Sequence, residues 1–161
     1  MVWTKLKKTA ESLLADSLRG RVEYHLARYG NGLSYIMRRG WIVFDKRQVA
    51  NFSTIKWIRK LHEQTGKWYS NDEQDLARLG EDGLFTRDDF VDGLDEYVGL
   101  KVEDAIKSSK PIVRAIAMFD RRFGKRRLNA MSVPDGEIQL VKDFYKIRMR
   151  AEGLESEPHT A

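Results

Sequence analysis

The chain has 161 residues, of which 42% are hydrophobic and 33% are charged, a size and composition typical of one globular domain with a hydrophobic core. It contains no cysteine, which excludes disulfides, iron–sulfur clusters and cysteine nucleophiles and fits a reducing compartment. Its net charge of +5 is unevenly distributed, because residues 1–69 and 107–136 are basic whereas residues 70–106 carry a net −9.

The N-terminal sequence predicts neither a signal peptide nor a membrane anchor. Lys5, Lys7 and Lys8 interrupt the start of the chain, so no continuous apolar stretch follows it. No other segment approaches the ~18 consecutive apolar residues that a membrane-spanning helix requires. We therefore expect a soluble protein of the bacterial cytoplasm that does not bind a membrane.

The first third of the chain predicts one helix followed by antiparallel strands. Apolar residues at three- and four-residue steps indicate an amphipathic helix over residues 4–18. Alternating apolar and polar residues then predict a strand at 22–26, and residues 30–32 read as a turn. Three further strands are expected at residues 33–39, 41–44 and 48–52. The connections are too short for parallel crossovers, so the four strands form an antiparallel meander.

From residue 53 onward the pattern is helical. Periodicity, capping residues and glycine stops predict helices over residues 53–65, 71–79, 87–98, 111–123 and 137–152, with a turn at 102–108. The helix at 111–123 is apolar on most sides, which is typical of a central buried helix. Pro111 suits the first position of that helix, since its missing N–H would have no partner there.

These elements predict an α+β fold, with an N-terminal helix, a four-stranded antiparallel meander and a C-terminal helical half packed on it. No internal repeat and no long linker divides the chain. We therefore expect residues 1–153 to form a single domain and residues 154–161 to form a flexible C-terminal tail.

The most distinctive segment places five cations within seven residues at the end of the predicted central helix. The cations are Arg121, Arg122, Lys125, Arg126 and Arg127. Cations at a helix C-terminus satisfy free carbonyls and complement the helix dipole, but one or two would suffice. Guanidinium groups on a rigid helix also bind phosphate oxygens in bidentate pairs. The segment is therefore either an anion-binding site, assisted by Arg38, Arg39 and Arg114, or a set of internal ion pairs.

The predicted sheet and the acidic segment are weaker candidates. On the sheet, aromatic residues such as Tyr24 and Trp41 lie among arginines, a mixture that binds single-stranded nucleic acid but also builds ordinary sheets. We expect core packing for both aromatic residues. The predicted helix 87–98 carries the carboxylates of Asp88, Asp89, Asp92, Asp95 and Glu96. Their spacing does not match a calcium-binding loop, so a solvated face is favoured over a metal site.

No familiar catalytic motif is present. The histidines His25, His62 and His159 are far apart in the sequence, and no HExxH, P-loop, GxGxxG or GxSxG motif occurs. An enzyme of a familiar class is therefore disfavoured, and we expect neither a cofactor nor a metal.

Several segments together resemble a family of small uncharacterised bacterial proteins. They are WTKLKK at residues 3–8, DSL at 16–18, GRV at 20–22, IKW at 55–57, AMFDRRFGKRRL at 117–128, FY at 144–145 and AEG at 151–153. The similarity spans nearly the whole chain, and the segment that ends in Gly-Lys-Arg-Arg-Leu is its most specific element. The family has no established activity, so the resemblance implies a bacterial, cytoplasmic, single-domain protein and assigns no functional residue.

Two functional hypotheses follow from the sequence. The first is a non-enzymatic protein that binds a polyanion such as RNA or DNA through the basic cluster at the helix end. The alternative is a protein-interaction or regulatory module, in which the acidic segment 70–106 meets a basic partner or the basic face of another copy.

Overall fold

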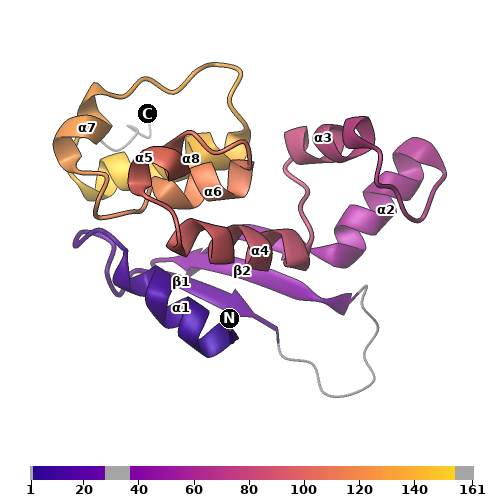
Figure 1. Ribbon diagram of the computed structural model, residues 1–161, viewed down its shortest axis with the longest axis horizontal. Coiled ribbons are helices and arrows are strands. Elements are labelled where there is room, and N and C mark those ends of the chain that lie inside the picture. Colours follow the sequence, from indigo (N-terminus) through magenta and orange to yellow (C-terminus); the bar gives the residue numbers. More distant parts are fainter. Residues whose placement is uncertain (1, 28–36, 155–161) are drawn as a thin grey trace, which may run out of the picture.

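The structure, a computed structural model, describes residues 2–27 and 37–154, so the expected tail lies outside it apart from Leu154. In chain order the elements are α1 (Trp3–Ser12), β1 (Val22–Leu26), β2 (Arg39–Phe44), β3 (Arg47–Ser53), α2 (Thr54–Thr65), α3 (Glu73–Glu81), α4 (Arg87–Val98), α5 (Val102–Ile106), α6 (Pro111–Ala117), α7 (Lys125–Ala130) and α8 (Gln139–Ala151). Helices and an antiparallel sheet are combined, which confirms the α+β prediction (Figure 1). Among the described residues, no helix is both long and apolar enough to cross a membrane.

The sheet of the described residues has three antiparallel strands in the order β1-β2-β3. β1 pairs directly with β2, with Val22 opposite Phe44. β2 and β3 are joined through Asp45 and Lys46, which both have a positive φ. That conformation is found in two-residue hairpin turns, because its twist matches that of antiparallel strands.

The prediction of four strands is therefore wrong for the part of the chain that is described. Most of the predicted strand 33–39 lies outside the described residues, residues 37 and 38 are in no strand, and Arg39 begins β2. Gly40, which falls between the predicted strands 33–39 and 41–44, lies within β2. A Cβ atom at Gly40 would lie 2.6 Å from Cδ1 of Phe90, so a glycine is needed where α4 approaches the sheet.

α1 and α4 pack on one face of the sheet and against each other (Figure 1). The side chains on this face, including those of Tyr24, Ile42 and Phe52, are buried in the main core. Phe90 of α4 stacks on Phe52, with the ring centroids 4.5 Å apart. The expectation that Tyr24 packs in the core is confirmed.

The same expectation is wrong for Trp41. Neighbouring residues of a strand lie on opposite faces, so the burial of Ile42 places Trp41 on the outer face. There the half-buried indole stacks on His25, with the centroids 5.3 Å apart, and the guanidinium of Arg39 lies 4.6 Å from its ring centroid.

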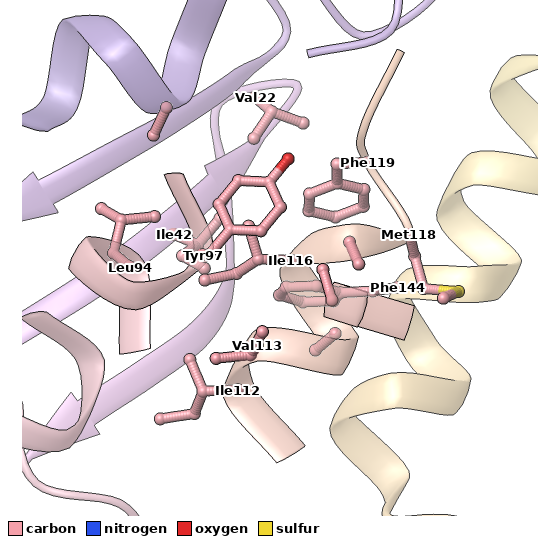
Figure 2. Close-up of a cluster of buried hydrophobic side chains, with 14 of the residues drawn as sticks. Val22, Ile42, Leu94, Tyr97, Ile112, Val113, Ile116, Met118, Phe119 and Phe144 are labelled. Carbon is pink, nitrogen blue, oxygen red and sulfur yellow. The ribbon is translucent and has the colours of Figure 1, made fainter. Parts of the chain in front are cut away.

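α6 is the central buried helix, as predicted, and Pro111 begins it. Figure 2 shows Ile112, Val113 and Ile116 gathered between α4 and α8. The segment predicted as a turn before this helix contains the short helix α5, which also packs on α6. The helical half is therefore built around α6 and rests on the sheet through α4.

The predicted N-terminal and central helices are both too long. α1 and α6 end early because the segments that follow them pair with each other. The N–H of Ala15 donates to the carbonyl of Phe119 over 2.8 Å, and the N–H of Arg121 donates to the carbonyl of Leu13 over 2.7 Å. Hydrophobic periodicity cannot reveal these ends, because the apolar residues beyond them are buried as well.

α2 and α3 form a helical arm, residues 54–81, at one end of the molecule (Figure 1). α2 is capped by Ser53, whose hydroxyl accepts a hydrogen bond from the N–H of Lys56, and it ends at Gly66, which has a φ of 73°. α3 begins two residues later than predicted because Asp72 caps it. Leu61 and Leu79 are fully buried yet lie outside the main hydrophobic cluster, so the arm has a small core of its own.

Candidate anion-binding site

Residues 118–127, here called the basic segment, connect α6 to α7 and continue into its first turn. The predicted position of the cations at a helix C-terminus is wrong. Arg121 and Arg122 follow the end of α6, whereas Lys125, Arg126 and Arg127 form the first turn of α7. The cause is the backbone pairing between residues 13–15 and 119–121, which takes the place of the last turns of the predicted helix. The basic segment therefore depends on tertiary contacts for its conformation.

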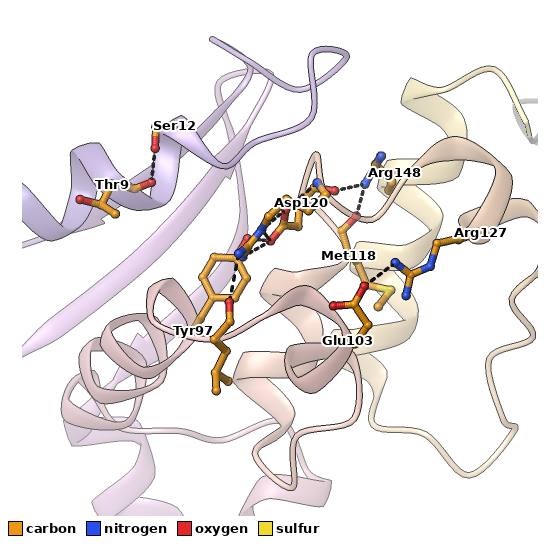
Figure 3. Close-up of polar contacts among 10 residues, drawn as sticks. Thr9, Ser12, Tyr97, Glu103, Met118, Asp120, Arg127 and Arg148 are labelled. Atoms are coloured by element: carbon orange, nitrogen blue, oxygen red, sulfur yellow. Dashed lines mark hydrogen bonds and ion pairs between the residues drawn. The ribbon is translucent and has the colours of Figure 1, made fainter.

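Asp120 organises the basic segment from a fully buried position. Its carboxylate accepts hydrogen bonds from the hydroxyl of Tyr97 over 2.6 Å and from the backbone N–H of Arg122 over 2.7 Å (Figure 3). The guanidinium of Arg122 completes an ion pair, with Nη2 2.7 Å from Oδ2. The hydrogen bond to Asp120 raises the pKa of Arg122. A buried carboxylate requires such a partner, so the charge of Arg122 is compensated inside the protein.

Arg148 of α8 holds the backbone of the same segment. Its buried guanidinium donates from Nη1 to the carbonyls of Met118 and Asp120, each over 2.9 Å (Figure 3). It also donates from Nη2 to the carbonyl of Phe123 over 2.7 Å. These carbonyls have few other partners because α6 has already ended. Arg148 therefore fixes the turn between α6 and α7.

The charge of Arg148 is compensated by Glu152, one helical turn further along the chain. Its Nε lies 2.9 Å from Oε1 of Glu152, which also accepts a 2.7 Å hydrogen bond from the hydroxyl of Ser17. Burial by itself would raise the pKa of Glu152, but these two hydrogen bonds, together with the positive charges of Arg148 and Lys125, outweigh it and the pKa is lowered.

Asp120 lies within the basic cluster and is an expected internal partner of its cations, whereas the organising role of Arg148 was not predicted. One signal was available, because Arg148 lies four residues after Phe144 and so falls on the apolar stripe of α8. An arginine in such a position requires buried acceptors. The sequence could not show that these acceptors are backbone carbonyls of the basic segment.

Three cations of the basic segment remain available to a ligand. The side chains of Arg121, Lys125 and Arg126 are exposed. None of the three forms a side-chain hydrogen bond or ion pair with another described residue. The internal network thus accounts for Arg122 and leaves these three cations in solvent.

Two further cations from the sequence prediction form ion pairs. Arg127 lies 3.0 Å from Glu103, and both side chains are largely exposed, so that this pair can exchange for a ligand (Figure 3). Arg114 forms a more buried pair with Glu137, with Nη2 2.7 Å from Oε1. The hydrogen bond from Arg114 lowers the pKa of Glu137, in keeping with a structural pair.

The structure does not bring Arg38 and Arg39 to the basic segment. Arg38 lies 4.0 Å from Asp88 in the first turn of α4, and Arg39 donates to the side chain of Asn51 in β3 over 2.8 Å. β3 leads directly into α2, and Figure 1 shows α2 and α7 at opposite ends of the molecule. These two arginines cannot contact the same short ligand as the cations of α7.

An open groove of about 500 Å³, here called the basic groove, lies beside the basic segment. Its lining residues are Ala15, Asp16, Ser17, Arg121, Arg122, Gly124, Lys125, Arg148 and Glu152. The carboxylates are compensated, since Glu152 binds Arg148 and Asp16 lies 3.5 Å from Arg19. No aromatic side chain lines the groove, and no group of three potential metal ligands occurs among the described residues. The groove therefore offers cations and no surface for stacking.

Residues 2–149 match the model of the SF0329 protein family. The match runs from α1 into α8 and includes the sheet and the whole basic segment, and it agrees with the family resemblance seen in the sequence. No curated protein and no solved structure matches the sequence. Because the matched region covers nearly the whole chain, the protein belongs to the SF0329 protein family.

Proposed function

We propose that this protein binds a polyanion, the phosphate backbone of RNA or DNA, through Arg121, Lys125 and Arg126, with Arg127 at the edge of the site. The observation that carries this proposal is the division of charge within the basic segment. One arginine compensates a buried carboxylate, while three cations are exposed and form no side-chain hydrogen bond or ion pair with a described residue. Cations needed only for stability would be expected to have partners in the fold.

The spread of the cations over the surface favours a ligand with a chain of phosphates over a single small anion. The cations lie along an open surface groove and the first turn of a helix and do not converge in an enclosed pocket. A nucleic-acid backbone repeats its charge at regular intervals and can engage separate cations in turn. Because the basic segment is held by buried hydrogen bonds, the backbone that carries the cations is fixed before the ligand arrives.

The absence of aromatic residues from the lining of the basic groove predicts how sequence affects binding. Proteins that read single-stranded bases usually stack them on exposed aromatic rings. This groove offers contacts only to phosphates and sugars, so that binding is expected to be insensitive to base sequence. We keep the cytoplasm, where RNA and DNA are abundant, as the expected location.

Fluorescence anisotropy with labelled RNA and DNA of about 20 nucleotides tests the proposal at several salt concentrations. Three phosphate contacts to a single strand predict a slope of about −2 for log K against log salt concentration. The triple variant Arg121→Gln, Lys125→Gln, Arg126→Gln should weaken binding by at least about tenfold at low salt.

A matched control removes the same charge elsewhere. Lys5, Lys8 and Arg59 are exposed and form no side-chain ion pair with a described residue. Their replacement by Gln should weaken binding by less than about threefold, through net charge alone. The proposal is wrong if neither nucleic acid binds at low salt, or if the two triple variants weaken binding equally.

A further inference from the structure

A second groove, here called the arm groove, is lined by residues of the arm, of α4 and of the start of α6. It has a volume of about 250 Å³. Its lining residues are Trp57, Leu76, Leu84, Phe85, Asp89, Asp92, Gly93, Lys110 and Ile112. Trp57 and Leu76 come from the two helices of the arm, while α4 supplies the two carboxylates. None of these residues belongs to the proposed nucleic-acid site.

One side of the arm groove is apolar and incompletely covered. Trp57 and Phe85 are half-buried, and Leu76 is 40% exposed. Leu76 is one of five large apolar side chains exposed among the described residues, and Trp68 and Tyr69, in the loop between α2 and α3, are two of the others. Trp68 and Tyr69 do not line the groove, whose apolar side includes Trp57, Leu76 and Phe85. An apolar surface left open to solvent marks a place where another molecule can bind.

The other side of the arm groove is acidic. Asp89 and Asp92 are both exposed, and Asp92 has no hydrogen bond or ion pair with another described residue. The one cation in the lining, Lys110, is engaged by Glu96 over 3.1 Å. Residues 70–106, which include α3 and α4, carry a net −9. An occupant of this groove must therefore present apolar and positively charged groups together.

We propose that the arm groove binds a basic amphipathic helix of a partner protein. An apolar side chain of that helix would contact Leu76 and Phe85, and a Lys or Arg would pair with Asp92. At about 250 Å³ the groove is smaller than the roughly 300–1,000 Å³ typical of small-molecule sites. A groove of this size can accommodate one apolar side chain of a helix that lies along it and is anchored by that side chain. The proposal does not depend on nucleic-acid binding, which uses the opposite end of the molecule.

A synthetic peptide can serve as the probe, because the apolar side and the acidic side of the groove together determine which residues the peptide needs. We would use a fluorescein-labelled peptide of leucine and lysine, about 14 residues long, patterned as an amphipathic helix of about four turns. Saturable binding measured by anisotropy is the expected result. The same peptide with every Lys replaced by Glu should not bind, because it meets the acidic side with like charge.

Two aspartates of α4 provide a matched pair of variants. Asp92 lines the arm groove, whereas Asp95, three residues later on the same helix, does not. Both are exposed and neither has an ion pair with a described residue, so both variants should keep the fold. Asp92→Lys should weaken binding of the Leu/Lys peptide by about tenfold or more, and Asp95→Lys by less than about threefold.

The apolar contact has its own pair of variants. Leu76→Ser should weaken peptide binding by about tenfold, whereas Tyr69→Ser, which removes an exposed ring outside the groove, should not. Equal losses for Asp92→Lys and Asp95→Lys would show that the peptide is held by general charge attraction, which overturns the proposal. Binding of the Glu peptide, or binding of the Leu/Lys peptide that does not saturate, would also overturn it. A change in oligomeric state caused by Asp92→Lys without peptide would identify a second copy as the occupant, which also overturns it.

The proposed nucleic-acid site and the proposed helix-binding groove can be tested independently, because each set of variants changes only one of them. Asp92→Lys and Leu76→Ser leave the cations of the basic segment in place, so that RNA binding should not weaken in either variant. The triple Gln variant of the basic segment leaves the arm groove intact and should bind the Leu/Lys peptide as the unchanged protein does.

Discussion

The arm and the basic segment lie at opposite ends of the molecule and are held by different interactions. The helix ends of the arm are fixed by neighbours in sequence, such as Ser53, which caps α2, and Gly66, which ends it. The basic segment is fixed by residues far away along the chain. Tyr97 lies 23 residues before Asp120 and Arg148 lies 28 residues after it, and both donate hydrogen bonds to it.

The two regions also differ in how they present groups to solvent. The arm leaves apolar side chains exposed, including Trp68, which is 64% exposed and stacks on His62 with ring centroids 3.6 Å apart. The basic segment buries its apolar side chains, including Phe119 and Phe123, and exposes cations. The arm thus combines local helix signals with exposed apolar groups, whereas the closely spaced like charges of the basic segment are supported by a buried hydrogen-bond network.

Phe119→Ala should give the largest loss of stability. The ring is buried and stacks on Phe144, with the centroids 4.4 Å apart. Removing it should lower the free energy of unfolding by about 3–5 kcal/mol, out of the ~5–15 kcal/mol typical of a domain. Urea unfolding measures the loss, with Tyr69→Ala in the exposed loop of the arm as a control that changes stability by about 0.5 kcal/mol or less. Similar losses in both variants would contradict the contrast between the regions.

Asp120→Ala should come next, at about 3 kcal/mol. This value is at the lower end of the range for breaking a buried ion pair, because Arg122 is about one-third exposed and can turn to solvent. The variant also leaves the hydroxyl of Tyr97 without its acceptor. The exposed Asp16 offers a control, whose replacement by Ala should change the free energy of unfolding by about 0.5 kcal/mol or less. A loss below about 1 kcal/mol for Asp120→Ala would show that the network does not hold the segment.

Gly66→Ala should destabilise the arm by about 1 kcal/mol. Gly66 has a φ of 73°, which strains any residue that carries a Cβ atom. Gly124 precedes α7 in an extended conformation with a φ of −75°, and a Cβ atom there would meet nothing within 4 Å. Gly124→Ala should therefore change stability by about 0.5 kcal/mol or less. Urea unfolding compares the two variants, and hydrogen exchange should show faster opening of α2 only in Gly66→Ala.

The double variant Arg126→Gln, Arg127→Gln should have the smallest effect on stability. Both side chains are exposed in the first turn of α7, so the free energy of unfolding should change by no more than about 1 kcal/mol. The variant should still weaken RNA binding in the anisotropy assay. If it unfolds as readily as Phe119→Ala, these arginines belong to a structural network and the proposed nucleic-acid site loses its main support.

Sequence alone determined the features that depend on residues close together in the chain. Thr86 and Asp89 form a capping box at the start of α4, Pro111 begins α6, and the turn at Asp45 and Lys46 joins two strands. Each is decided by backbone preferences and side-chain hydrogen bonds that act over about four residues. The mixed α+β composition followed from the same signals.

Only the tertiary structure decided where α1 and α6 end and which cations face a ligand. Arg121 and Arg122 are adjacent and chemically identical in the sequence. They differ because a buried carboxylate must be compensated, and the fold brings Asp120 to Arg122 and leaves Arg121 in solvent. Pairing between segments more than a hundred residues apart sets this arrangement. No local pattern contains that information, because the stabilising contacts form only when the chain is folded.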